Sequence, residues 1–372
     1  MIYIHIPYCK GKCIYCNFYS GGNPHWEKFF NTLASELSER IDELRGASIS
    51  SIYFGGGTPS LAPPEYVEDY LQTIFIQGAK HSIKFEDDLE ITLEVNPEDV
   101  TEENSVVWKK AGINRISMGV QSLQNSELKL LNRRHSAERV YDAIRILKRY
   151  FKNLSLDLIY GIPGQTVTTL NESLNKILYF SPNHISTYSL TFEQGTPLYL
   201  LKSKGMVEEL DEEAFLEFDN LIDKTLKREG YERYEISNYA KPGYRSKHNS
   251  GYWDSKAYLG LGPSACSYDG KRIRRTNLPD LNSYLEGTVL HDDESLSDEE
   301  LKEEYIMTRL RTHEGISLED FKLKFGEDSA TRLIGKAYKW AYDGRMIQTG
   351  SSLSLTLSGI PVSDYIILDL LQ

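Results

Sequence analysis

Short apolar runs alternate with amphipathic stretches over the first half of the chain. Apolar residues recur at helical spacing between residues 26 and 44, and Gly46 follows as a stop signal. Residues 89–95 instead alternate between apolar and polar positions, as a half-buried strand does. The same criteria predict further strands at 2–6, 51–54, 115–120, 154–159 and 184–190, and further helices after Pro63 and at 102–110, 128–131, 140–147, 166–180 and 211–229. Six strands separated by helices predict a parallel sheet with right-handed crossovers, and six units in place of eight leave a barrel incomplete.

The second half of the chain is less regular. A strand is predicted at 231–236, followed by an irregular, aromatic segment at 239–284. Acidic residues at 292–300 predict a linker, which divides the chain into domains 1–290 and 291–372. The second domain has predicted helices at 301–311, 318–325 and 330–342 and a hairpin at 346–357 that turns at Gly350. This order predicts a small winged-helix-like α+β domain, and its acidic charge favours protein docking or a lid over DNA binding.

Composition narrows the set of partners. The 372 residues are 40% hydrophobic and 26% charged, with a formal net charge of −12. Because binding along a phosphate backbone needs a basic surface, we expect no nucleic-acid partner. The chain has neither an apolar leader nor an apolar run of about eighteen residues, so we expect no transmembrane span. Four cysteines, three of them on one loop, are no disulfide framework, and we expect a reducing cytoplasm.

The first predicted strand runs directly into a loop that carries Cys9, Cys13 and Cys16, in the spacing C-x3-C-x2-C. Three thiolates on so short a loop can converge on one metal centre. Iron–sulfur clusters normally take four thiolates, so three would leave one iron open to a non-protein ligand. A structural zinc site with His5 or a distant histidine as its fourth ligand is the alternative. Zinc sites usually show a second cysteine or histidine pair, and Cys266 lies far along the chain.

The cysteine spacing after a strand resembles the radical S-adenosylmethionine (SAM) superfamily. The stretch YIHIPYC at residues 3–9 is similar to the branch that contains oxygen-independent coproporphyrinogen III dehydrogenases and HemW-type haem chaperones. This resemblance covers nearly the whole chain. It implies a partial (β/α)6 TIM-like barrel and a [4Fe-4S] cluster on Cys9, Cys13 and Cys16. It also implies that the amino and carboxylate groups of SAM fill the open iron position.

Candidate SAM-binding residues lie at the carboxyl ends of the predicted strands, where parallel α/β barrels collect their active sites. The segment Gly56-Gly57-Thr58-Pro59 follows the second strand, and residues without Cβ let a backbone approach a ligand closely, although a plain turn is the alternative. The resemblance implies that this segment contacts the SAM ammonium and carboxylate groups. It implies SAM contacts as well for Tyr3, Tyr15, Glu94, Gln121, Arg133 and Asp157. In the dehydrogenases Gln121, Arg133 and Asp157 would face a second SAM, so the number of SAM sites stays open. For Glu94 the alternative is a salt bridge to a helix.

Haem contact is expected around His248. Residues 248–253 (HNSGYW) resemble the H-N-x-x-Y-W signature of the haem-chaperone branch, and an imidazole can ligate haem iron while aromatic rings stack on a porphyrin. A buried, hydrogen-bonded histidine is the alternative, and for His5 we expect that role. Arg272, Arg274 and Arg275 would hold propionates or form a solvated face, and Cys266 is expected to be a small buried residue.

Two functions compete, beside a zinc-stabilised barrel with unrelated metabolism. One is a haem chaperone that binds haem and delivers it to an acceptor protein; the other is a coproporphyrinogen III dehydrogenase of porphyrin biosynthesis, which decarboxylates propionates oxidatively. The dehydrogenases carry a fourth cysteine where this chain has Phe18, and an extension ahead of the cysteines where Cys9 stands near the start. Both departures favour the chaperone. The sequence leaves SAM cleavage and a homodimer open.

Overall fold

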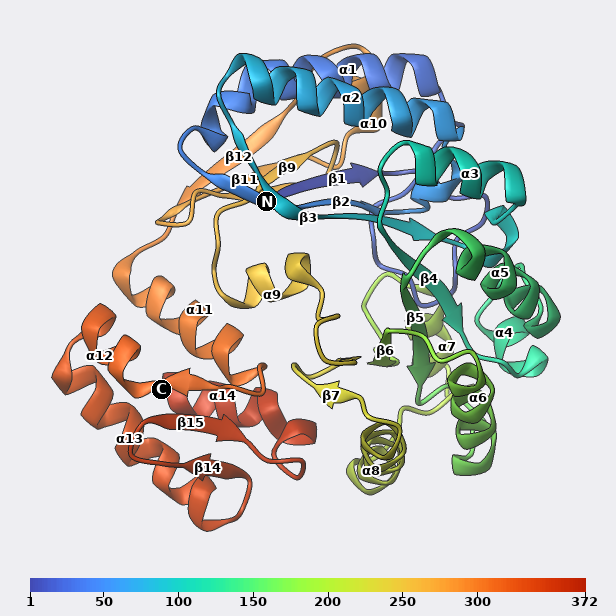
Figure 1. The fold of residues 1–372 in the computed structure, drawn as a ribbon. Helices are drawn as coiled ribbons and strands as arrows, with labels where there is room; N and C mark the ends of the chain where they lie inside the picture. Colours follow the sequence, from blue (N-terminus) through green and yellow to red (C-terminus); the bar gives the residue numbers. More distant parts are fainter.

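Nine strands form one open, curved sheet in the computed structural model, which describes residues 1–372 (Figure 1). The strand order is β7-β8-β6-β5-β4-β3-β2-β1-β9. Six successive strands run parallel: β1 (Ile2–Ile6), β2 (Ser48–Gly56), β3 (Lys84–Val95), β4 (Arg115–Gln121), β5 (Asn153–Tyr160) and β6 (His184–Ser189). The edge strands β7 (Glu232–Arg233) and β9 (Leu259–Leu261) do not pair with each other. The sheet is therefore a partial barrel, which confirms the predicted α/β class.

Helices cover the convex face of this sheet (Figure 1). They are α1 (Trp26–Arg40), α2 (Pro64–Lys80), α3 (Glu102–Lys110), α4 (Asn125–Leu130), α5 (Ala137–Tyr150), α6 (Val167–Tyr179) and α8 (Glu212–Arg228). Successive side chains of β1 point to opposite faces of the sheet. Ile2, Ile4 and Ile6 are fully buried in the main core. Tyr3 and His5 face the inside of the curved sheet. No helix is long and apolar enough to span a bilayer.

The segment predicted to be irregular holds several short elements. Besides β9 it contains β8 (Asn238–Ala240), α9 (Lys247–Trp253), β10 (Cys266–Tyr268), β11 (Ile273–Asn277) and α10 (Leu281–Leu285). A short helix ahead of this segment, α7, spans Pro197–Ser203. The predicted acidic linker is also wrong, because β12 (His291–Ser295) pairs antiparallel with β11. Its acidic residues are accommodated because arginines on β11 lie opposite them. Arg275, for example, pairs with Asp293 at 2.7 Å.

The C-terminal part has its own hydrophobic core of 14 buried residues. It contains α11 (Asp298–Leu310), β13 (Ile316–Ser317), α12 (Leu318–Phe325), α13 (Glu327–Tyr342), β14 (Met346–Gln348), β15 (Ser352–Leu355) and α14 (Ser363–Leu371). The three helices and the hairpin agree with the winged-helix-like prediction. The final helix was not predicted; it buries Ile366, Ile367 and Leu370 in this core. A division of the chain into domains at residue 290 stays a prediction.

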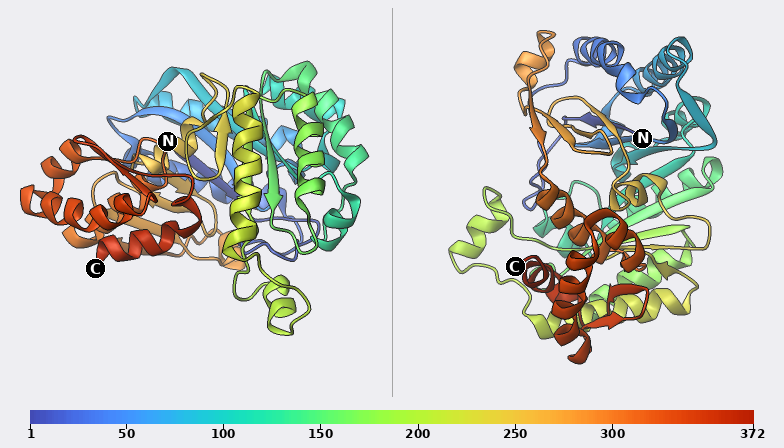
Figure 2. Two further views of the ribbon diagram at one scale, coloured as in Figure 1. Left: turned by 90° about the horizontal axis from the view of Figure 1, so that it is seen from below. Right: turned by 90° about the vertical axis from the view of Figure 1, so that its left-hand side faces the viewer.

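This C-terminal unit lies along the open side of the sheet (Figure 2). Backbone hydrogen bonds join it to the β7 edge: Ile236 N donates to Arg311 O at 2.9 Å, and His313 N donates to Tyr234 O at 3.0 Å. Near the β9 edge, β12 leads directly into α11. The unit therefore bridges the two unpaired edges of the partial barrel.

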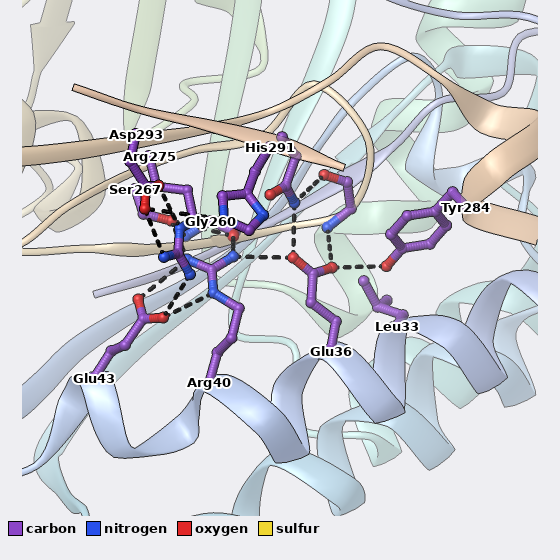
Figure 3. Close-up of polar contacts among 12 residues, drawn as sticks. Leu33, Glu36, Arg40, Glu43, Gly260, Ser267, Arg275, Tyr284, His291 and Asp293 are labelled. Carbon is purple, nitrogen blue, oxygen red and sulfur yellow. Dashed lines mark hydrogen bonds and ion pairs between the residues drawn. The ribbon is translucent and has the colours of Figure 1, made fainter. Parts of the chain in front are cut away.

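A buried polar network fastens β9 to α1 (Figure 3). Glu36 accepts hydrogen bonds from Gly262 N at 2.9 Å, Asn277 Nδ2 at 2.7 Å and Tyr284 OH at 2.8 Å. Arg40 pairs with Glu36 at 3.0 Å, and its guanidinium also donates to Gly260 O. Both charges have partners on every side, which is the condition under which a buried ion pair is tolerated.

Gly260 is required for the same junction. A Cβ atom at this position would lie 1.9 Å from the carbonyl oxygen of Cys266, so only glycine lets the β9 and β10 backbones approach this closely.

We expect Glu36→Ala to lower the free energy of unfolding by roughly 3–5 kcal/mol, because it leaves three buried donors without their acceptor and removes one of the two carboxylates that pair with Arg40, the other being Glu43. Urea unfolding followed by circular dichroism measures the change. Glu39→Ala, at an exposed position of the same helix without a side-chain partner, is the matched control. Equal stability of the two variants would contradict a structural role for the network.

Candidate functional site

A cavity of ≈ 830 Å³ opens at the carboxyl ends of the parallel strands. Most of the predicted site residues line it: Cys9, Cys13, Tyr15, Cys16, Gly56, Gly57, Thr58, Glu94, Gln121, Arg133 and Asp157. The strand ends bring these residues together from segments far apart in the chain, as the parallel topology predicts. Tyr3 and His248 do not line this cavity.

The three cysteines of the loop are half-buried free thiols. Cys9 Sγ lies 3.3 Å from Thr58 Oγ1, and Arg133 Nη1 donates to Cys13 Sγ at 3.5 Å. Burial raises the pKa of Cys16. This donor set suits an iron–sulfur cluster with three protein ligands, and the adjoining cavity has the volume of a small-molecule site. The residues present therefore fit a cluster with a ligand beside it.

Asn96 joins the two sides of the cysteine loop, and sequence reasoning did not select it. Its Nδ2 donates to Thr58 Oγ1 at 3.2 Å, and its Oδ1 accepts from Arg133 Nη2 at 2.7 Å. A chain of contacts thus runs from Cys9 through Thr58, Asn96 and Arg133 to Cys13. The sequence feature that could have identified Asn96 is its position directly after β3, at the end of a parallel strand.

The glycine segment packs against the base of the cysteine loop. Gly56 has a φ of 112°, and a Cβ there would lie 2.7 Å from the His5 ring. A Cβ on Gly57 would lie 2.7 Å from Tyr8 O, and the Gly57 N–H donates to Ile6 O at 2.9 Å. Both positions need glycine because the backbone packs too closely against β1 and the start of the cysteine loop to leave room for a Cβ atom.

Two carboxyl groups lie at the floor of the cavity. Glu94 accepts a hydrogen bond from Tyr53 OH at 2.8 Å, and Asp157 accepts one from Ser117 Oγ at 3.2 Å. Burial raises the pKa of Glu94 to about 7 and raises the pKa of Asp157 as well. The alternative of a salt bridge to a helix does not describe Glu94, because its side-chain partner is the hydroxyl of Tyr53 on β2.

His248 is a buried residue, and the prediction that it ligates haem iron does not agree with its surroundings. The imidazole is 1% exposed, with Nδ1 2.9 Å from Ser51 Oγ and Nε2 3.0 Å from Tyr252 OH. Its ring stacks on Tyr53 at a centroid distance of 4.8 Å, and burial lowers its pKa to about 3. The helix α9 places it against β2, where both ring nitrogens are engaged. The alternative of a hydrogen-bonded core histidine describes it.

Tyr3 and His5 form a pair next to this histidine. Tyr3 OH lies 3.1 Å from His5 Nδ1, and His5 Nε2 lies 3.0 Å from Tyr19 O. The expected role of His5 as a hydrogen-bonded residue of the barrel interior is therefore confirmed. A SAM contact by Tyr3 stays a prediction, because its side chain lines a different cavity.

The raised pKa of Glu94 predicts a pH effect on stability. Between an unfolded pKa near 4.5 and a folded pKa of about 7, the folded protein binds more protons, so stability falls as pH rises through this window. Glu94→Gln should remove this decrease in the free energy of unfolding, which is on the order of 2 kcal/mol between pH 4.5 and 8. Urea unfolding at both pH values, with the exposed Glu103→Gln as control, measures the difference. Parallel pH profiles for wild type and Glu94→Gln would contradict the assignment.

Comparison with known proteins places this geometry in a family. Residues 3–177 match the radical SAM superfamily, and residues 296–362 match the HemN C-terminal domain. The heme chaperone HemW of Lactococcus lactis is 35% identical over 87% of this chain and 84% of its own length. That of Bacillus subtilis is 33% identical over 87% and 86%.

A solved structure has the same fold over the full length. The coproporphyrinogen III oxidase HemN of Escherichia coli superimposes with a TM-score of 0.82, covering 99% of this chain and 89% of its own, at 18% identity. This likeness establishes the fold, whereas the relatives above establish the family. The chain belongs to the HemW family of the radical SAM superfamily.

Proposed function

We propose that this protein is a haem chaperone that carries a [4Fe-4S] cluster, binds SAM, and delivers haem to an acceptor protein. The observation that carries the proposal is the full-length similarity to heme chaperones HemW, together with three free thiols at the mouth of one large cavity. A cytoplasmic location is part of the proposal.

In this proposal Cys9, Cys13 and Cys16 hold the cluster, whose bound form would supply a single electron for reduction of the SAM sulfonium. The chain's own residues orient the ligand. The planar guanidinium of Arg133 suits a carboxylate, and Asn96 fixes the plane of that guanidinium. The glycine segment leaves backbone accessible beside the thiols, while Glu94 offers a carboxyl group at the floor.

The dehydrogenase alternative gains no support from the structure. Phe18 stands at the place of the dehydrogenases' additional cysteine, and its ring is 66% exposed at the edge of the cavity. The structural likeness to HemN at 18% identity extends to the fold alone.

Replacing any one of Cys9, Cys13 or Cys16 by alanine should abolish the brown chromophore of anaerobically reconstituted protein, because each supplies one of only three protein ligands. Iron and acid-labile sulfide analysis measures the loss. Cys266→Ala is the control and should keep full cluster content, because Cys266 lies outside this cavity. Bound zinc without iron or sulfide would contradict the cluster assignment.

Arg133→Lys should weaken SAM binding at least tenfold, since the guanidinium already donates to Cys13, Asn96 and Gly119, and a lysine ammonium cannot keep these three contacts and still reach a carboxylate. Isothermal titration calorimetry on cluster-loaded protein measures the affinity. Arg145→Lys, at an exposed position on α5, is the control. Unchanged SAM affinity with normal iron content would show that Arg133 only supports the loop.

A further inference from the structure

A second cavity, of ≈ 420 Å³, lies between the barrel and α11. Aromatic rings dominate its walls: Phe18, Tyr3, Tyr19, Tyr252, Tyr258 and Tyr268. They come from the end of the cysteine loop, from β1, from α9, from the segment between α9 and β10, and from β10 itself. The helix α11 contributes Glu304 and Thr308. Its volume falls within the range of small-molecule sites, and no residue proposed above to hold the cluster lines it.

The tyrosine hydroxyls are mostly turned toward the protein. Tyr252 OH lies 3.0 Å from His248 Nε2, and Tyr268 OH donates to Lys271 O at 3.0 Å. Tyr19 OH accepts from Leu281 N at 2.9 Å. With their polar ends engaged, these residues leave ring surface for a ligand. Such a cavity suits a flat, largely apolar molecule that stacks against aromatic side chains.

One cation lines the cavity, and it has unused donors. Arg274 Nη1 and Nη2 donate to the two carboxylate oxygens of Glu304 at 2.6 and 2.8 Å. A guanidinium has five N–H groups, so three remain for a second carboxylate. The neighbouring arginines point elsewhere: Arg272 pairs with Asp298, and Arg275 pairs with Asp293. Of the three arginines considered for propionates, Arg274 alone lines either of the two cavities described above.

We propose that this second cavity, and not the cysteine-lined one, holds the haem, with tyrosine rings against the macrocycle and Arg274 on a propionate. The proposal rests on the proposed function of a haem chaperone. Cys266, expected to be buried, is half-exposed on the wall of this cavity. Phe18 lines both cavities, so the segment that ends the cysteine loop is shared between the cluster site and the haem site.

A bulky side chain placed inside the second cavity tests whether haem binds there. Titration of the cluster-loaded protein with haem, followed at the Soret band, should show at least tenfold weaker binding for Thr308→Trp, whose indole occupies the space from α11. Met307→Trp is the matched control, because Met307 is the adjacent, exposed residue and does not line the cavity. Arg274→Gln should weaken binding about tenfold through the lost charge-assisted hydrogen bonds, and Arg275→Gln should not.

The outcomes separate the two proposals. If wild-type protein binds no haem, both the chaperone function and this site are wrong. If wild-type protein binds haem and both Thr308→Trp and Arg274→Gln bind it equally well, only the site is wrong. Haem displaced by SAM would place it in the first cavity and also overturn the site. Equal iron and sulfide content in all variants shows that they are folded.

Discussion

The cysteine loop depends on side chains from other strand ends that hold it against the barrel. Cys9 contacts Thr58, Asn96 connects Thr58 to Arg133, and Arg133 reaches Cys13. These residues are distant in the chain and meet only because parallel strands place their carboxyl ends at one edge. A loop of this length, with three thiols and no strand of its own beyond β1, would otherwise be free to adopt many conformations.

The second constraint is that the sheet stays open. Its two edges do not pair, and the C-terminal unit bridges them through backbone hydrogen bonds around Ile236 and through the continuity of β12 with α11. The buried Glu36–Arg40 network fixes the β9 edge to α1. An open barrel with a bridged side leaves room for two cavities, one at the strand ends and one beside α11.

The sequence predicted those features whose signal is local. The cysteine spacing and the glycines after β2 could be assigned because each follows a strong strand pattern, whereas Arg133 was assigned through the family resemblance. The structure brings all of them to one cavity. Strand β9 was missed because three residues are too few to show alternation. The linker over β12 was misassigned because two of its acidic residues lie opposite arginines on the neighbouring strand and Asp293 pairs with Arg275, which composition alone does not reveal. His248 fits a motif, yet packing of α9 on β2 buries it, and such a tertiary effect has no local signature.

The most direct measurement is Mössbauer spectroscopy of protein reconstituted with 57Fe, with and without SAM. Three cysteine ligands on a four-iron cluster leave one iron chemically distinct from the others. We expect one iron site whose isomer shift changes when SAM is added, while the remaining sites stay constant. Four equivalent irons that do not respond to SAM would contradict an open coordination position, and with it the proposed role of the cysteine-lined cavity.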